Sequence, residues 1–196
     1  MIPRKLLSCS PLDVDRLVKH FLNDITGEDR RLRFGYEVKD EVIDTYLAKS
    51  LENYGIKSMW FVIEEGDRFI ASCHVAYDKK SKTAELGLTV SPFYRNQKIG
   101  QELFNRGVIW ARAMGADSIF MHCLTENKAI QHIASKGGMT VVTIDYGEKE
   151  ATIKVNKNFM AAGAEDAVMD NIAIYDTIVR NQRWFYKKFM KGLLGH

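Results

Sequence analysis

The chain has 196 residues, of which 46% are hydrophobic and 27% are charged, and it contains only three prolines. This composition is typical of a globular protein with a buried core, and it excludes a disordered or low-complexity chain. The net charge of +3 suits an anionic ligand, but it does not by itself indicate binding to nucleic acid.

Cysteine usage and hydropathy indicate the compartment. Cys9, Cys73 and Cys123 are widely spaced, odd in number and without a clustered set of histidines. They predict neither a disulfide framework nor a metal site, and they favour a reducing compartment. The first ten residues lack the apolar run of a secretion signal, and no run of roughly 18 apolar residues predicts a membrane span. We therefore expect a cytoplasmic protein.

The N-terminal part predicts two helices. Apolar side chains recur at helical spacing in residues 11–24 and again in residues 39–53. Ser10 is placed to cap the first helix ahead of Pro11. Residues 26–36 are charged and predict a loop.

The middle of the chain predicts strands. Residues 58–64 and 69–77 flank the turn sequence Glu65-Gly66-Asp67 and predict a hairpin, which the strand of residues 83–90 follows. Residues 99–114 predict a helix that ends at Gly115. Its expected inner face comprises Leu103, Phe104, Val108, Ile109 and Ala113.

The remaining elements predict the fold class. Residues 117–124 predict a strand, residues 126–136 a helix, and residues 139–146 and 151–155 a hairpin around Gly147. Helices followed by antiparallel strands and then a β-α-β-α-β run indicate an α/β fold, or an α+β fold with a mixed sheet.

The C-terminal residues predict a separate extension. Residues 164–191 follow a break at Gly163 and read as one long amphipathic helix, so we divide the chain into a domain of residues 1–157 and an extension of residues 158–196. The extension interleaves bases with aromatic residues, namely Arg180, Arg183, Lys187, Lys188 and Lys191 with Trp184, Phe185, Tyr186 and Phe189. We expect it to pack on its own domain or on a second copy. Binding to nucleic acid, a membrane surface or an acidic partner is the alternative.

One segment indicates chemistry. The strand that ends at Val90 runs through a short loop into the helix that begins at Ile99. The first amides of a helix lack internal partners and carry the positive end of its dipole, so such a loop can bind a diphosphate. Gly100 allows close backbone approach, and Arg95 adds a positive charge. The alternative is an ordinary strand-to-helix connection.

Residues 84–101 (Ala-Glu-Leu-Gly-Leu-Thr-Val-Ser-Pro-Phe-Tyr-Arg-Asn-Gln-Lys-Ile-Gly-Gln) resemble motif A of the GNAT acetyltransferases. In that motif a strand leads into an Arg/Gln-x-x-Gly-x-Gly/Ala loop. Arg95 matches the leading arginine and Gly100 the final glycine, whereas Lys98 takes the place of the usual first glycine. Residues 126–130 and 136–139 are similar to the family's asparagine-bearing helix and the turn after it. Residues 31–35, 40–43 and 121–124 resemble a bacterial GNAT subgroup with a tail helix.

The resemblance implies a GNAT acyl-CoA N-acyltransferase fold with acetyl-CoA as the cofactor. The backbone groups of Leu88 and Val90 would pair with the pantetheine arm. Asn127 would contact CoA, although its alternative role is to cap a helix. The loop implied to hold the diphosphate comprises Arg95, Asn96, Gln97, Lys98, Ile99, Gly100 and Gln101.

Glu85 is the candidate catalytic base. An alkyl amine has a pKa of about 10.4, so a base must take its proton at neutral pH. Some family members carry a catalytic glutamate at the matching place, and Glu85 shares a strand face with Gly87 and Thr89. Its alternative is a solvent-facing or ion-paired glutamate. The tyrosine that many relatives use as a general acid is replaced by Ala134.

The other conspicuous side chains favour structural roles. His74, His122 and His132 have no metal-ligand spacing. His122 and Cys123 are neighbours in a strand that reads as buried, so they favour core packing over a Cys–His nucleophile pair. Trp60, Phe61 and Trp110 are expected in the core.

We therefore expect an N-acetyltransferase that moves an acetyl group by direct transfer from acetyl-CoA to a primary amine of a small molecule or a protein lysine. The segments up to residue 53 are expected to border the acceptor. The alternative, indicated by Lys98 and the missing tyrosine, is a catalytically inactive CoA-binding or partner-binding regulatory protein. Neither a membrane nor a nucleic acid is expected as a partner, and a homodimer is left open.

Overall fold

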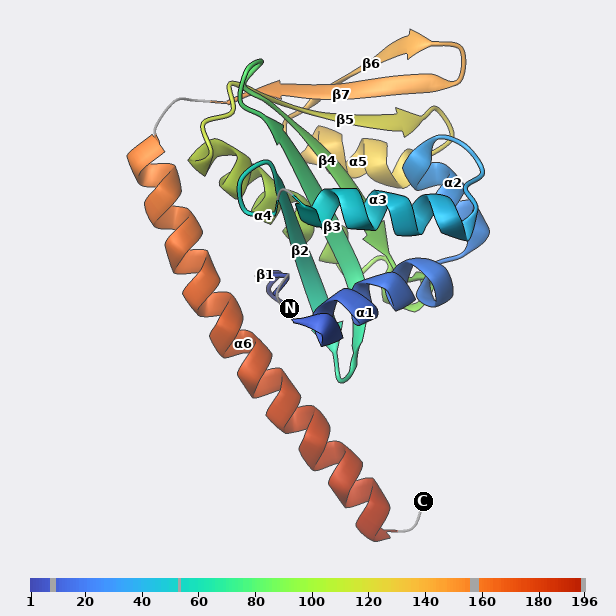
Figure 1. The fold of residues 1–196 in the computed structure, drawn as a ribbon, viewed down its shortest axis with the longest axis vertical. Coiled ribbons are helices and arrows are strands. Elements are labelled where there is room, and N and C mark those ends of the chain that lie inside the picture. Colours follow the sequence, from blue (N-terminus) through green and yellow to red (C-terminus); the bar gives the residue numbers. More distant parts are fainter. Residues whose placement is uncertain (8–9, 53, 156–158, 195–196) are drawn as a thin grey trace.

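The computed structural model describes residues 1–7, 10–52, 54–155 and 159–194 and shows one mixed sheet with helices on both faces (Figure 1). Within these residues the seven strands follow the order β1-β2-β3-β4-β5-β7-β6, and every neighbouring pair is antiparallel except β4 and β5. The strands are β1 (Arg4–Lys5), β2 (Ser58–Glu65), β3 (Arg68–Asp78), β4 (Thr83–Val90), β5 (Ser118–Leu124), β6 (Thr140–Asp145) and β7 (Glu148–Lys154). The predicted mixed-sheet fold is confirmed.

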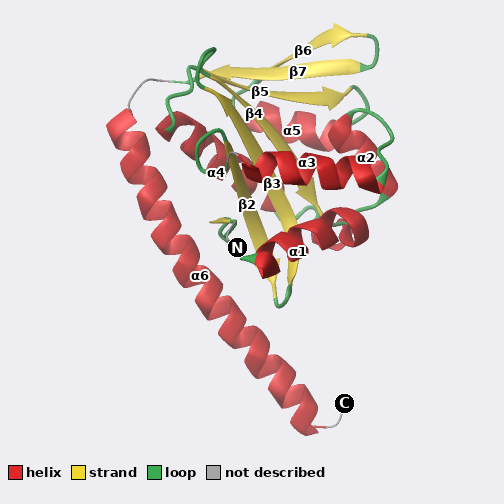
Figure 2. Cartoon of the chain, in the orientation of Figure 1, coloured by secondary structure: helices red, strands yellow, loops and turns green. Residues whose placement is uncertain are grey.

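The helices form two layers and one long arm, as Figure 2 shows. On one face of the sheet lie α1 (Pro11–Lys19), the π-helical turn η1 (His20–Asp24), α2 (Gly27–Phe34) and α3 (Asp40–Glu52). On the other lie α4 (Ile99–Ala113) and α5 (Lys128–Lys136), with the short helix η2 (Pro92–Tyr94) ahead of α4. The arm is α6 (Phe159–Leu194).

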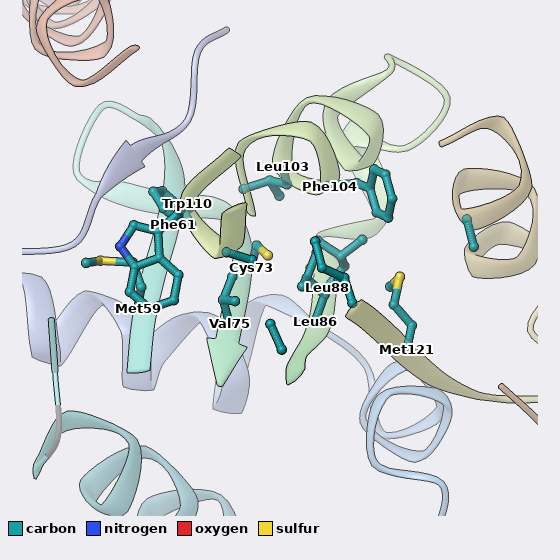
Figure 3. Close-up of a cluster of buried hydrophobic side chains, with 14 of the residues drawn as sticks. Met59, Phe61, Cys73, Val75, Leu86, Leu88, Leu103, Phe104, Trp110 and Met121 are labelled. Atoms are coloured by element: carbon teal, nitrogen blue, oxygen red, sulfur yellow. The ribbon is translucent and has the colours of Figure 1, made fainter. Parts of the chain in front are cut away.

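Each face of the sheet has its own apolar core. Beneath α4, Phe61, Val75 and Leu86 pack with Leu103 and Phe104 (Figure 3). Leu17, Phe21, Ile43 and Leu47 of the opposite layer pack with Trp60 and Phe69. The predicted core aromatics are confirmed, since Trp60, Phe61 and Trp110 are each at most 3% exposed. Val108, Ile109 and Ala113, expected on the inner face of α4, are only half-buried.

The prediction of a loop for residues 26–36 is wrong, because α2 occupies most of this segment. Thr26 and Asp29 form a reciprocal capping box at its start, and Gly35 ends it with a φ of 86°. No residue of α2 is fully buried, so the helix lacks the apolar stripe by which helices are recognised in a sequence. Local hydrogen bonds at both ends define this helix in place of burial.

The prediction of a long C-terminal helix is confirmed, but its expected start after Gly163 is wrong. Helix α6 runs unbroken through Gly163 for 36 residues, about 54 Å at the usual rise per residue. A glycine inside a helix costs only about 1 kcal/mol. Burial of Ala162 and Ala173 against the domain offsets that cost.

Helix α6 is attached to the domain through a buried cation. Arg106 of α4 has a fully buried side chain and binds Asp166 of α6 at 2.5 Å and also Asp170. Lys5 of β1 reaches the same two carboxylates at 2.9 and 2.6 Å. Further along α6, Asp176 accepts from the N–H of Ile2, Arg180 and Asn181 donate to Glu64, and Trp184 lies against Gly66 of the β2–β3 turn. Beyond Trp184 the end of the helix leaves the domain (Figure 1), with Phe185, Tyr186 and Phe189 each about two-thirds exposed.

Three predictions concern residues outside the described ones: Cys9, the helix end at Asn53 and the boundary between residues 157 and 158. The side chain of Lys191 is likewise not described. Among the described residues, no helix is both long and apolar enough to cross a membrane.

Replacing Arg106 with alanine is predicted to lower the free energy of unfolding by about 2–3 kcal/mol, because the carboxylates of Asp166 and Asp170 lose their buried partner and keep only Lys5. Urea-induced unfolding measures this loss. The matched control is Arg112→Ala, whose more exposed pair with Glu165 spans 3.7 Å and contributes at most about 1 kcal/mol. Equal, small effects of both substitutions would show that Arg106 does not attach α6.

Candidate functional site

The site begins where two parallel strands part. Strands β4 and β5 pair only from Thr83–Ser118 to Glu85–Phe120. Beyond this point β4 keeps its pairing with β3 as far as Val90, while β5 keeps its pairing with β7 as far as Leu124. The facing edges of β4 and β5 are therefore left open to a ligand, and an open strand edge offers main-chain hydrogen bonds.

Between the parted strands lies a cleft of about 480 Å³. Leu86 to Val90 line it from β4, and Met121 and His122 line it from β5. The loop before α4 and the first residues of α4 form one end, and α5 contributes Ala129, Ile130 and Ile133. The cleft therefore combines an apolar wall with a polar end, as small-molecule sites do.

The start of α4 forms the polar end of the cleft. Ser10, Thr26 and Asn127 cap α1, α2 and α5 with side-chain oxygens, whereas Lys98 at the N-cap position of α4 provides no side-chain cap. Within the described residues, the backbone N–H groups of Ile99, Gly100 and Gln101 have no hydrogen-bond acceptor. Free amides at the positive end of a helix dipole suit a phosphate group.

The loop before α4 adopts a conformation that usually requires glycine. Asn96 and Lys98 have φ angles of 60° and 63°, in the left-handed region that side chains rarely adopt. The position where GNAT sequences usually carry glycine is thus a left-handed position here, held by a lysine. Gly100 matters for packing, since a Cβ there would lie 2.7 Å from Ile133 Cδ1 of α5.

Helix α2 extends across the mouth of the cleft and is tied to both sides. Asp29 binds Arg95 of the loop at 2.5 Å, and Arg31 pairs with Glu126 ahead of α5. Asn127 Nδ2 donates to the carbonyl oxygen of Leu32 at 3.4 Å. Arg95 therefore faces the cleft with its charge already paired to a carboxylate.

Most of the predicted cofactor residues gather in this cleft. Leu88, Val90 and Asn127 line it, together with Arg95, Asn96, Lys98, Ile99, Gly100 and Gln101 of the loop and α4. Gln97 lies apart, because its side-chain amide is exposed and donates to Phe93 O at 3.3 Å. Asn127 also caps α5, accepting from the N–H of Ile130 at 3.2 Å, so both of its anticipated roles remain compatible.

Glu85 lies in a second cavity of about 380 Å³ on the α2 and α3 side of the sheet. Glu148, Cys123, Tyr46 and His74 line this cavity as well. Both cavities share Leu32, Arg33, Gly87 and His122, which mark the junction between them. The predicted base is thus on the other side of this junction from the cofactor loop.

A row of hydrogen bonds runs from the junction into the core. Arg33 Nη2 donates to Tyr46 Oη at 2.9 Å, Tyr46 Oη lies 2.8 Å from His74 Nδ1, and His74 Nε2 lies 2.7 Å from Ser58 Oγ. Burial, assisted by the charge of Arg33, lowers the pKa of His74 to about 3. Burial also raises the pKa of Tyr46 to about 12, so both groups are neutral at neutral pH.

Several residues of the site were not predicted from the sequence. Asp29 and Arg33 belong to α2, and the capping pattern from Thr26 to Asp29 with Gly35 after it was the signal that could have revealed this helix. His122 was expected in a buried strand, but its side chain is 50% exposed because β5 has parted from β4 at that position. Cys123 is buried as expected. Ala134 on α5 is also buried, a property that was not predicted.

The fold and the cleft define a class of proteins, the acyl-CoA N-acyltransferases of the GNAT type. A sequence profile of the Acetyltransferase (GNAT) family matches residues 22–138. The chain therefore belongs to the GNAT acetyltransferase family. No curated protein matches the sequence.

Solved structures share the fold at low sequence identity. The GNAT domain of S. lividans PAT has a TM-score of 0.67 and 14% identity, with 78% of this chain and 89% of that one covered. The PaiA N-acetyltransferase of Thermoplasma acidophilum, in complex with coenzyme A, has a TM-score of 0.59 and 15% identity over 79% of this chain and all of that one (100%). The Campylobacter jejuni N-acetyltransferase PseH, in complex with acetyl coenzyme A, has a TM-score of 0.54 and 14% identity over 79% and 98%.

Protein stability is predicted to fall as the pH falls from about 6.5 toward 4. His74 and His20 are buried with pKa values of about 3 and 4, whereas both bind protons near pH 6.5 once the chain is unfolded. Each histidine therefore lowers the free energy of unfolding by about 2 kcal/mol as the pH falls from neutral to about pH 5. Urea-induced unfolding at the two pH values measures the loss, which His74→Asn should reduce and the exposed control His132→Asn should not. An unchanged loss in His74→Asn would contradict the neutral state of His74.

Proposed function

We propose that the protein transfers the acetyl group of acetyl-CoA to a primary amine. The observation that carries this proposal is the junction at Gly87, where a cleft with an uncapped helix N-terminus meets a cavity that holds a carboxylate. Membership of the GNAT family and the CoA complexes of structural neighbours support the choice of acetyl-CoA.

The residues of the cleft fit acetyl-CoA. The free N–H groups of Ile99, Gly100 and Gln101 would bind the diphosphate, and Lys98 would add charge beside them. The open edge of β4 at Leu88 and Val90 would pair with the amides of the pantetheine arm as an added strand does. With the diphosphate at the start of α4 and the pantetheine arm along β4, the thioester carbonyl of the cofactor would lie at the Gly87 end of the cleft.

The acceptor amine would approach from the second cavity. Glu85 and Glu148 give that cavity two carboxylates, which suit an amine that arrives protonated. Glu85 would accept a proton from the amine, whose nitrogen then forms a bond to the acetyl carbon while the carbon–sulfur bond breaks. The products are the N-acetylated amine and CoA, whose sulfur takes up the second proton that the amine nitrogen loses.

The leaving thiolate would be protonated without a tyrosine. The place of that tyrosine is taken by Ala134, which is fully buried on α5. A CoA thiol is acidic enough to leave without strong assistance from a general acid, and water in the open cleft can pass the second proton of the amine nitrogen to the sulfur. The absence of the tyrosine is therefore compatible with catalysis.

Acetyl-CoA is predicted to bind the wild-type protein with micromolar affinity, measured by calorimetric titration. Arg95→Ala should weaken binding about tenfold, because a charged hydrogen-bond donor to the diphosphate is lost. Asp29→Asn should strengthen it by up to about fivefold, because Arg95 is released from its carboxylate partner. Equal affinities in all three proteins would contradict a diphosphate site at this loop, and no binding to the wild type would overturn the proposed function.

Glu85→Gln is predicted to lower kcat at least about 100-fold while leaving the affinity for acetyl-CoA unchanged, since Glu85 lies outside the cofactor cleft. The assay measures thiol release from acetyl-CoA in the presence of small amines and lysine peptides. The matched control is Glu41→Gln on α3, an exposed carboxylate that lines neither cavity. Acetyl-CoA binding without turnover on any amine would support the catalytically inactive alternative.

A further inference from the structure

The guanidinium of Arg33 lies directly against the backbone of β4 at Gly87. A Cβ at Gly87 would come within 1.8–2.4 Å of Arg33 Nη2, Cζ and Nε. Any residue larger than glycine would therefore displace the guanidinium, so the two positions fit together. Gly87 lies within β4 and its φ is not positive, so the backbone conformation does not require glycine there. The missing side chain instead provides the space that the guanidinium of Arg33 occupies.

The guanidinium is hydrogen-bonded to a neutral group and lies over the rings of Phe34 and Tyr46, 5.2 and 5.8 Å from their centres. Glu85 and Glu148 line the same cavity without forming an ion pair with it. Its hydrogen bond to Tyr46 Oη is supported in turn by His74 and Ser58. In the same helix, Arg30 pairs with Asp40, and Arg31 pairs with Glu28 and Glu126. Arg33, by contrast, has no ion pair within the described residues. A guanidinium has five N–H donors, so Arg33 keeps donors available for a ligand.

A half-buried cation without an ion pair is costly, and contacts with aromatic rings offset only part of that cost, so a negative charge beside it is favourable. Arg33 lines both cavities, beside Gly87 at their junction. Under the proposed function this is where the thioester carbonyl meets the attacking amine. Negative charge builds up on that carbonyl oxygen as the carbon–nitrogen bond forms, and a donor fixed in place beforehand stabilises it efficiently.

We propose that Arg33 is a catalytic residue that donates a hydrogen bond to the thioester carbonyl oxygen of acetyl-CoA. The inference rests on the proposed function. Tyr46 is the positioning residue that holds the guanidinium against Gly87. Glu85, two residues along the same face of β4, takes the proton of the amine, so the two charged groups act on opposite partners of the reaction. Binding of a carboxylate on the acceptor is the competing role for Arg33.

The test is carbon NMR of acetyl-CoA labelled with ¹³C at the thioester carbonyl. Bound to the wild type, the carbonyl signal should move downfield, because a hydrogen bond to the oxygen withdraws electrons from the carbon. Arg33→Met should abolish this shift while changing the affinity for acetyl-CoA less than about threefold, since donors of this kind act mainly in the transition state. Gly87→Ala, which moves the guanidinium without removing its charge, should reduce the shift.

The matched control is Arg30→Met, which removes a neighbouring cation of α2 that is paired to Asp40 and lines neither cavity. It should leave the carbonyl shift unchanged.

With an accepted amine, Arg33→Met should also lower kcat about 100-fold. A wild-type shift that persists in both Arg33→Met and Gly87→Ala would overturn the role of Arg33 alone. A rise in KM confined to carboxylate-bearing acceptors, with the shift intact, would assign Arg33 to the acceptor instead. Failure of acetyl-CoA to bind the wild type would overturn the proposed function as well.

Discussion

The parting of β4 from β5 is the constraint on which the rest of the structure depends. Parallel strands that pair at three positions and then separate leave open backbone edges inside the domain, and such edges need a partner. The surrounding elements are arranged around this opening: α4 and α5 close it on one face, and α2 crosses it on the other. Gly87 lies just beyond the last β4–β5 pair, so the two cavities meet where the strands begin to separate.

Charge is distributed around this opening in a consistent way. Free amides and Lys98 lie at one end, the unpaired guanidinium of Arg33 lies in the middle, and the carboxylates of Glu85 and Glu148 lie in the far cavity. An anionic cofactor and a cationic acceptor would each meet the opposite sign. The hydrogen-bonded row behind Arg33 contains only neutral groups, because burial keeps His74 unprotonated and Tyr46 protonated. Arg33 therefore carries the only charge in this row, and Tyr46, His74 and Ser58 do not neutralise it.

The features that the sequence revealed are those with a local signal. The strand, loop and helix of residues 83–113 show alternation, a turn and then helical spacing, and all but one of the predicted cofactor residues line the cleft. Helix α2 was missed because its stability comes from caps and not from an apolar stripe. The exposure of His122 and the burial of Arg106 depend on distant partners. The first follows from where β4 and β5 separate, and the second from carboxylates 60 and 64 residues further along the chain. No window of local sequence contains that information.

The central claim is that the uncapped start of α4 binds the diphosphate of acetyl-CoA. The most direct measurement is a titration of the ¹⁵N-labelled protein with acetyl-CoA, followed by NMR of the backbone amides. The claim predicts large downfield shifts of the Ile99, Gly100 and Gln101 amide protons, with the capped amide of Asp13 in α1, which lies outside the cleft, much less affected. Saturable binding that leaves the three α4 amides unshifted would place the cofactor elsewhere and contradict the claim.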